Sequence, residues 1–131
     1  MLRLRHLLRI YIQELLVVTE PGTIHVKADS VGSVTGTPQN DALQKWKEGR
    51  EKTQEAYHFI RMGLRNATGK DSLHLTQIRD SLRMQEQETN FLFLKEQGNN
   101  TLGTFMRKMV RGSLTEEQQK LLDESLQKEI H

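Results

Sequence analysis

Two long helical patterns, joined by a short turn, constrain this chain more than any other feature. Between residues 41 and 98, apolar side chains recur every three or four positions, which places them on one face of a helix. The pattern breaks at residues 66–71, whose asparagine, threonine and glycine are typical of a turn. Helices of this length joined by so few residues lie antiparallel, so we predict a helical hairpin over residues 41–98. The expected seam consists of Leu43, Trp46, Thr53, Tyr57, Ile60, Leu64 and Ala67 in the first helix and Leu75, Ile78, Leu82, Gln85, Thr89 and Leu92 in the second.

A further helix is expected before the hairpin. Residues 1–18 are apolar over more than half of a helical circumference, with Arg5 and Arg9 on the remaining side, so we predict a first helix that is buried or bound to a partner. Residues 19–40 are punctuated by proline and glycine, and a pair of short strands there would be marginal on its own. We therefore interpret residues 19–40 as a long connection laid over the bundle.

Residues 99–131 favour short helices. Apolar spacing over residues 102–110 indicates one helix, which Gly112 is expected to end. Thr115 and Gln118 have the spacing of a capping box, so the last helix should begin there. The predicted fold is all-α: a single domain of residues 1–131, built as an antiparallel bundle of three main helices with one or two short C-terminal helices.

Composition narrows the classes of function. Hydrophobic residues make up 35% and aromatic residues 5% of the 131, which is lean and suits a helical protein that completes its core against a partner. The chain has no cysteine, which excludes disulfides, thiolate catalysis and cysteine-based zinc sites. The formal net charge is +2, and the two basic clusters, in residues 1–18 and 99–112, are neither dense enough nor rich enough in aromatic residues to argue strongly for nucleic-acid binding. Charges also interrupt every apolar run, so no transmembrane segment is expected.

Candidate chemical motifs do not converge on a reaction. Glu55 and His58 have the spacing of a carboxylate metal site, but Tyr57 occupies the seam and should turn both outward. No nucleophile, base and orienting group come from neighbouring positions. We therefore expect a protein that is not an enzyme, with no catalytic or metal site. A secondary basic patch is expected from the side chains of Arg107, Lys108 and Arg111.

Three segments resemble a known family. Residues 3–9, Arg-Leu-Arg-His-Leu-Leu-Arg, are similar to the start of the LYR-motif proteins, small mitochondrial three-helix assembly factors, although the tyrosine of that motif is absent. Residues 60–66 followed by Asp71 resemble the second signature of the family, in which Leu64 would usually be phenylalanine. Residues 93–97 and 114–117 are most similar to the branch named for formation of mitochondrial complex V, the ATP synthase.

The resemblance implies a role and a location. It implies a protein of the mitochondrial matrix that catalyses nothing itself and, like a chaperone, helps the ATP synthase or a respiratory complex to assemble. Some members of the family bind the acylated mitochondrial acyl carrier protein, and that acyl chain is the one cofactor the resemblance implies. By the same resemblance, the partner-binding residues would be Arg5, Arg9, Arg61, Leu64 and Arg65.

Two alternatives remain open from the sequence. One is an accessory subunit of another stable assembly, which would use the first helix and the lean core as its interface. The other is a basic peripheral membrane or nucleic-acid binder that would use Arg107, Lys108 and Arg111. A charge-driven contact of the second kind would weaken steeply with salt.

Overall fold

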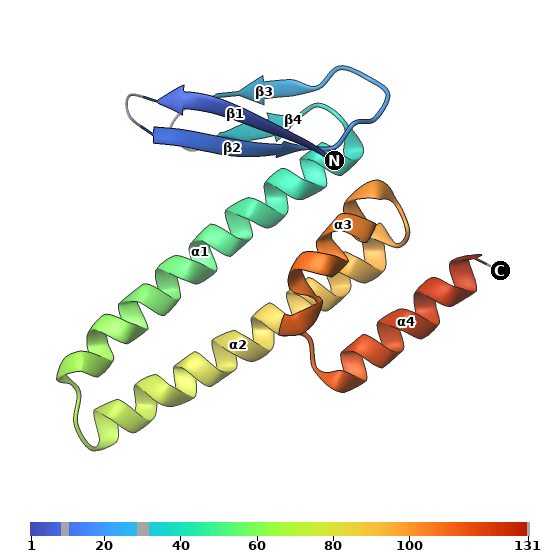
Figure 1. Cartoon of the computed structure of the whole chain (residues 1–131). Helices are drawn as coiled ribbons and strands as arrows, with labels where there is room; N and C mark the ends of the chain where they lie inside the picture. The colour runs from blue at the N-terminus through green and yellow to red at the C-terminus, as the bar shows by residue number, and fades with distance from the viewer. Residues whose placement is uncertain (9–10, 29–31, 131) are drawn as a thin grey trace. The chain divides into compact units, whose positions relative to one another are not determined.

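The computed structural model describes residues 1–8, 11–28 and 32–130 (Figure 1). Within these residues, four strands come first and four α-helices follow, with one short 3₁₀ helix between the last two. The prediction of a mostly helical chain is therefore confirmed. The chain divides into two compact units, Met1–Glu48 and Gly49–His131, which are described separately below. The single-domain organisation stays a prediction.

The first unit contains two small antiparallel sheets. Strand β1 (Leu2–Leu8) pairs with β2 (Tyr11–Val17), and β3 (His25–Lys27) pairs with β4 (Ser33–Thr35). The prediction of a first helix over residues 1–18 is thus wrong. The interpretation of residues 19–40 as a plain connection is also wrong, because a two-stranded sheet lies within it.

The error over residues 1–18 has a physical reason in the spacing of its apolar residues. Leu2 and Leu4 alternate with arginines, and this period of two suits a strand. The apolar residues of the whole segment also recur every three or four positions, which suits a helix equally well. In the sheet, Leu2 lies opposite Val17 and Leu4 opposite Leu15. Leu15 and Val17 are buried while the residue between them is only half-buried. Strand β4 lies beside β2. Burial of one face of β2 favours the strand over the helix, because only the strand places alternate residues on that face.

A buried asparagine fastens the strands to the start of helix α1 (Pro38–Asn66). The Asn40 side chain is fully buried; its Nδ2 donates to the carbonyl of Val18 at 2.8 Å, and its Oδ1 accepts from the Val18 N–H at 2.8 Å. The Glu20 carboxylate accepts from the backbone N–H groups of Gln39 and Asn40 at 2.9 and 3.1 Å. These bonds satisfy first-turn donors that have no partner within the helix. Helix α1 therefore begins at Pro38, three residues before the predicted hairpin, and proline is well suited to a first helical position.

The second unit contains the predicted hairpin from residue 49 onward. It comprises the part of α1 from Gly49 onward and helix α2 (Lys70–Gln97), joined by residues 67–69. A side chain at Gly63 would touch Leu75, while Ala56 and Leu82 line one groove together. Residues near the end of α1 therefore lie beside residues near the start of α2, so the two helices run antiparallel.

The closed core of the second unit lies at the far end of α2. Helices α3 (Thr101–Val110) and α4 (Glu116–Ile130) pack there, joined by η1 (Arg111–Ser113), and Gly112 falls within η1. The fully buried side chains of this C-terminal core are Leu94, Leu102, Met106 and Leu122. Their burial removes large apolar area from water, which makes this end of the unit its main source of stability.

Both C-terminal helices start with side-chain caps. Asn100 Oδ1 accepts from the Gly103 N–H at 2.7 Å at the start of α3. Before α4, Thr115 Oγ1 accepts from the Gln118 N–H at 3.1 Å, and Gln118 Oε1 accepts from the Thr115 N–H at 3.0 Å. The capping box predicted from the sequence is therefore confirmed.

Candidate functional site

An open groove of about 550 Å³ runs between α1 and α2 in the second unit. Its walls carry no Asp, Glu, Lys or Arg side chain; the described residues that line it are Ala56, Phe59 and Ile60 from α1 and His74, Gln77, Ile78, Ser81, Leu82 and Gln85 from α2. The wall from α1 is apolar, whereas the wall from α2 mixes apolar side chains with neutral polar ones. An uncharged concave surface of this kind favours an apolar or neutral ligand.

The groove is open because residues 49–89 of the hairpin bury few hydrophobic side chains. Among the described residues from 49 to 89, Ile60 is the only buried hydrophobic side chain. Phe59 beside it is 69% exposed, and Ile78 across the groove is 41% exposed. Leu82, which belongs to the predicted seam, is only half-buried. Of the predicted seam, Ile60, Ile78, Leu82 and Gln85 line the groove without closing it.

The exposed apolar side chains of α1 and α2 gather on the face of this groove. Met62 follows Phe59 by three positions, and Leu73 and Met84 stand four before and seven after Gln77, a residue of the groove wall. Positions at these spacings share one side of a helix. The apolar strip beside the groove consists of Phe59, Met62, Leu73, Ile78, Met84 and Leu92. Exposed apolar side chains that gather on one face in this way mark an interaction surface.

The arginines predicted to bind a partner do not lie on the groove face. Arg61 is exposed and stands two positions after Phe59, a rotation of about 200° around the helix, and Arg65 follows one turn later. Leu64 is half-buried between these two faces. Arg9 lies outside the described residues, as does the side chain of Arg5. The structure thus keeps Arg61 and Arg65 together and separates both from the groove.

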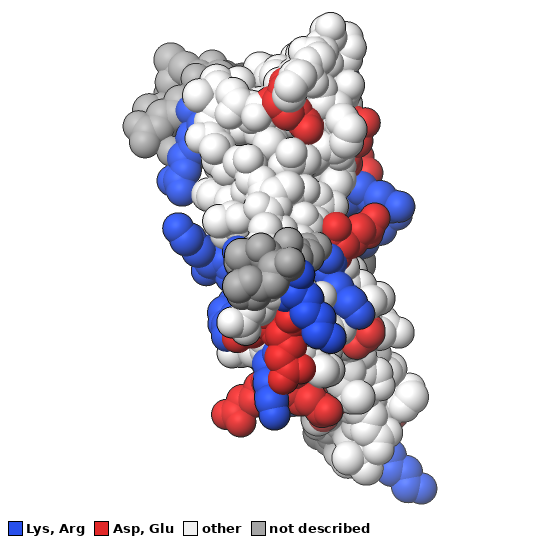
Figure 2. Space-filling model, turned by 90° about the vertical axis from the view of Figure 1, so that its right-hand side faces the viewer, with Lys and Arg blue, Asp and Glu red and all other residues white. Residues whose placement is uncertain are grey.

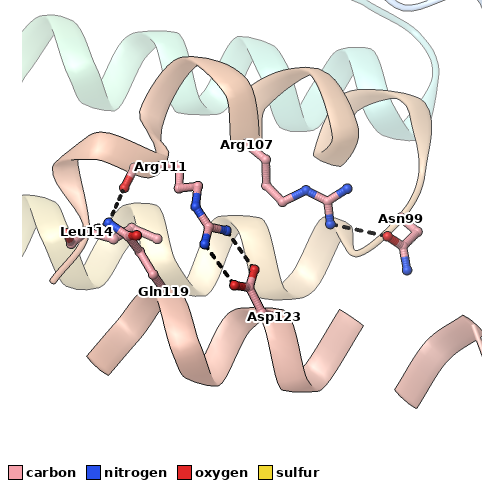
Figure 3. Close-up of polar contacts among 6 residues, drawn as sticks. All are labelled: Asn99, Arg107, Arg111, Leu114, Gln119 and Asp123. Atoms are coloured by element: carbon pink, nitrogen blue, oxygen red, sulfur yellow. Dashed lines mark hydrogen bonds and ion pairs between the residues drawn. The ribbon is translucent and has the colours of Figure 1, made fainter. Parts of the chain in front are cut away.

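The secondary basic patch is partly neutralised (Figure 3). Arg111 donates through Nη1 and Nη2 to the two Asp123 carboxylate oxygens at 2.6 and 2.8 Å. This bond from Arg111 lowers the pKa of Asp123, so the carboxylate stays charged. Arg107 donates to Asn99 Oδ1 at 3.2 Å, while Lys108 is exposed. The basic patch stays a prediction, although one of its three cations, Arg111, is paired with Asp123.

Charges of both signs also mix on the surface. On the face drawn in Figure 2, blue Lys and Arg side chains stand directly beside red Asp and Glu side chains. Intermixed signs give weak net fields, so this face is poorly suited to a polyanion. The Arg111–Asp123 pair likewise reduces the attraction of this region for a polyanion.

The seam residue Tyr57 lies where the sequence places it. It is half-buried, and burial raises its pKa, with Glu86 adding to the rise and Arg83 opposing it. Glu55 and His58, on either side of Tyr57, are exposed as predicted. Within the described residues, no three His, Cys, Asp or Glu side chains come close enough to hold a metal ion.

Comparisons with known proteins add no further constraint. No family model, curated protein or solved structure matches this chain significantly. In the part of the chain that the structure describes, no helix is both long enough and apolar enough to cross a membrane. The candidate site therefore rests on the geometry of the groove.

Sequence reasoning missed most of the apolar strip beside the groove. Phe59, Met62, Leu73 and Met84 do not belong to the predicted seam, because they stand on a second stripe beside it. The signal was present: on each helix, apolar residues continue past the seam on one side. An apolar arc wider than one seam needs is the pattern of a helix with two packing partners.

Proposed function

We propose that this protein is a non-catalytic adaptor that holds a helix of a protein partner in the groove between α1 and α2. The observation that carries the proposal is the uncharged groove flanked by strongly exposed apolar side chains, Phe59 and Met84 above all, each 69% exposed. Such side chains cost free energy in water, and a partner that covers them recovers it.

A helix is the ligand that suits this groove. Two antiparallel helices with a gap between them offer parallel ridges, and a third helix packs into such a gap through side chains at positions i, i+3, i+4 and i+7. The neutral lining favours an apolar helix face, since a charged face would lose its hydration against Phe59, Ile60 and Ile78 without gaining a counter-charge.

The assembly role implied by the family resemblance is kept as part of this proposal. An adaptor in the mitochondrial matrix that serves the ATP synthase or a respiratory complex would need such a helix-binding surface. The acyl-carrier contact through Arg5 and Arg9 is not carried over, because β1 and β2 occupy the segment that a first helix would fill. A stable accessory subunit would use the same groove.

Site-specific photo-crosslinking tests the proposal. Benzoylphenylalanine placed at Phe59 reports on the groove face, and the same group at Arg61 is the matched control on the other side of α1. We expect adducts with a protein from position 59 and none from position 61. Absence of adducts at 59, or the same adducts from both positions, would overturn the groove as a binding site.

A further inference from the structure

We infer that the partner in this groove is a second copy of the chain, related by a two-fold axis that passes α1 at Phe59 and α2 near Arg79. The inference rests on the proposed function, because it takes the groove face as the contact surface. A two-fold axis makes the interface self-complementary, so each residue pair occurs twice.

The position of the axis follows from the register of the hairpin. A side chain at Gly63 would touch Leu75, and four residues back along α1 and four on along the antiparallel α2 this contact sets Phe59 level with residue 79. An axis that crosses both helices at right angles and passes Phe59 must therefore pass α2 close to residue 79. Two copies of the hairpin would then stack groove to groove as a four-helix bundle, with each helix antiparallel to its own copy.

Charge complementarity supports this arrangement. Lys70 and Glu88 are both exposed, and each stands seven positions from a groove residue, Gln77 and Ser81 respectively. They lie equally far on either side of residue 79. The axis therefore brings Lys70 against the partner's Glu88 at both ends of the interface. Glu88 also accepts a hydrogen bond from Gln118 at 3.3 Å, which holds its carboxylate at this end of α2.

Apolar residues are balanced about the same axis. Leu73 and Met84 stand six positions before and five after residue 79, so Leu73 would meet the partner's Met84 on both sides. Phe59 would pack against the partner's Phe59 on the axis itself. These three side chains are 60%, 69% and 69% exposed in the order Leu73, Met84 and Phe59. Covering an aromatic anchor at the centre of an interface is the usual source of its affinity.

The contact area is large enough for a dimer. The stretch from residue 70 to residue 88 is about 28 Å long, and two helices are about 20 Å wide. The footprint is then roughly 550 Å² on each copy, or about 1,100 Å² in total, which clears the roughly 1,000 Å² expected of a biological interface but lies below the size of stable ones, at about 1,200–2,000 Å². The dimer should accordingly be concentration-dependent.

Sedimentation equilibrium of the full chain tests the inference. Lys70→Glu and Glu88→Lys should each weaken dimerisation about fivefold to tenfold, since each creates two like-charge contacts. The double exchange restores both pairs and should return the dissociation constant to within about twofold of the original. Phe59→Asp should weaken the dimer at least about tenfold. Arg61→Glu, the matched charge reversal on the other side of α1, should change nothing.

The outcomes separate this inference from the proposed function. Recovery in the double exchange would establish the two-fold arrangement. A chain that stays monomeric up to about 100 µM, or a dimer indifferent to Phe59→Asp and to both charge reversals, would overturn it. In the monomeric case, crosslinks from Phe59 to another protein would still support the adaptor. If crosslinking at Phe59 also yields nothing, both proposals fail.

Discussion

The two ends of helix α2 differ more than their sequences suggest. Near its C-terminus, Leu94 is fully buried against α3 and α4, whereas near its N-terminus Leu73 is 60% exposed. Both leucines belong to one continuous helix. The difference comes from the neighbours: two short helices return to cover one end, while α1 alone accompanies the other. Stability is therefore concentrated at the C-terminal core, and the hairpin arm of residues 49–88 is left available for binding.

The largest expected effect comes from a matched pair of leucines. Leu122→Ala in the C-terminal core should lower the free energy of unfolding by about 2–5 kcal/mol, because a cavity replaces a fully buried side chain. Leu73→Ala in the arm should cost about 0.5 kcal/mol or less. Urea unfolding at low protein concentration measures both. Equal losses would mean that the arm is as tightly packed as the core.

A pair of glycines should change stability in opposite directions. A Cβ on Gly103 would collide with the carbonyl oxygen of Gly98, so Gly103→Ala should cost about 1–3 kcal/mol. Gly49 lies inside α1 with open space around it, and Gly49→Ala should stabilise the helix by about 0.5–1 kcal/mol. Thermal unfolding of the two variants compares them directly. A stabilising Gly103→Ala would contradict the close approach of α3 to the end of α2.

The smallest effect concerns the ion pair of the C-terminal region. Because Arg111 lowers the pKa of Asp123, the pair contributes stability above the ordinary pKa of an aspartate, about 3.9, and this contribution is lost as the pH falls. The Arg111 and Asp123 side chains are 41% and 53% exposed, so solvent screens the pair and Asp123→Asn should cost less than about 1 kcal/mol at pH 7. Between pH 7 and pH 3, the free energy of unfolding should fall less steeply in the variant than in the original protein. The same slope in both proteins would show that the pair adds nothing.

The helices of the second unit could be predicted because their local signals agree with their packing. The turn before Lys70 and the capping box of Thr115 and Gln118 act over a few residues and leave their mark in the sequence. The strands at residues 2–17 could not be predicted with equal success, because leucines in that stretch suit both periods and the choice depends on distant residues such as Val34.

The candidate site was predictable only in part for a related reason. Arg61 and Arg65 were chosen from a motif, and their helix is where the sequence predicts it, but their face is not that of the groove. Openness of the groove depends on how far α3 and α4 extend along α2. The length of a helix can be predicted from the sequence. The part of α2 that a short helix such as α3 or α4 will cover cannot.

Cysteine crosslinking at residue 59 tests the central claim, that the arm is an interaction surface and not a loosely packed core. The chain has no cysteine, so Phe59→Cys and Arg61→Cys each introduce a single thiol at neighbouring positions of α1. With a short bismaleimide, and at a protein concentration high enough to offset the loss of the Phe59 ring, we predict that the thiol at 59 links two copies rapidly, while the protein with the thiol at 61 stays monomeric. Equal and slow crosslinking at both positions would contradict the two-fold contact through the groove.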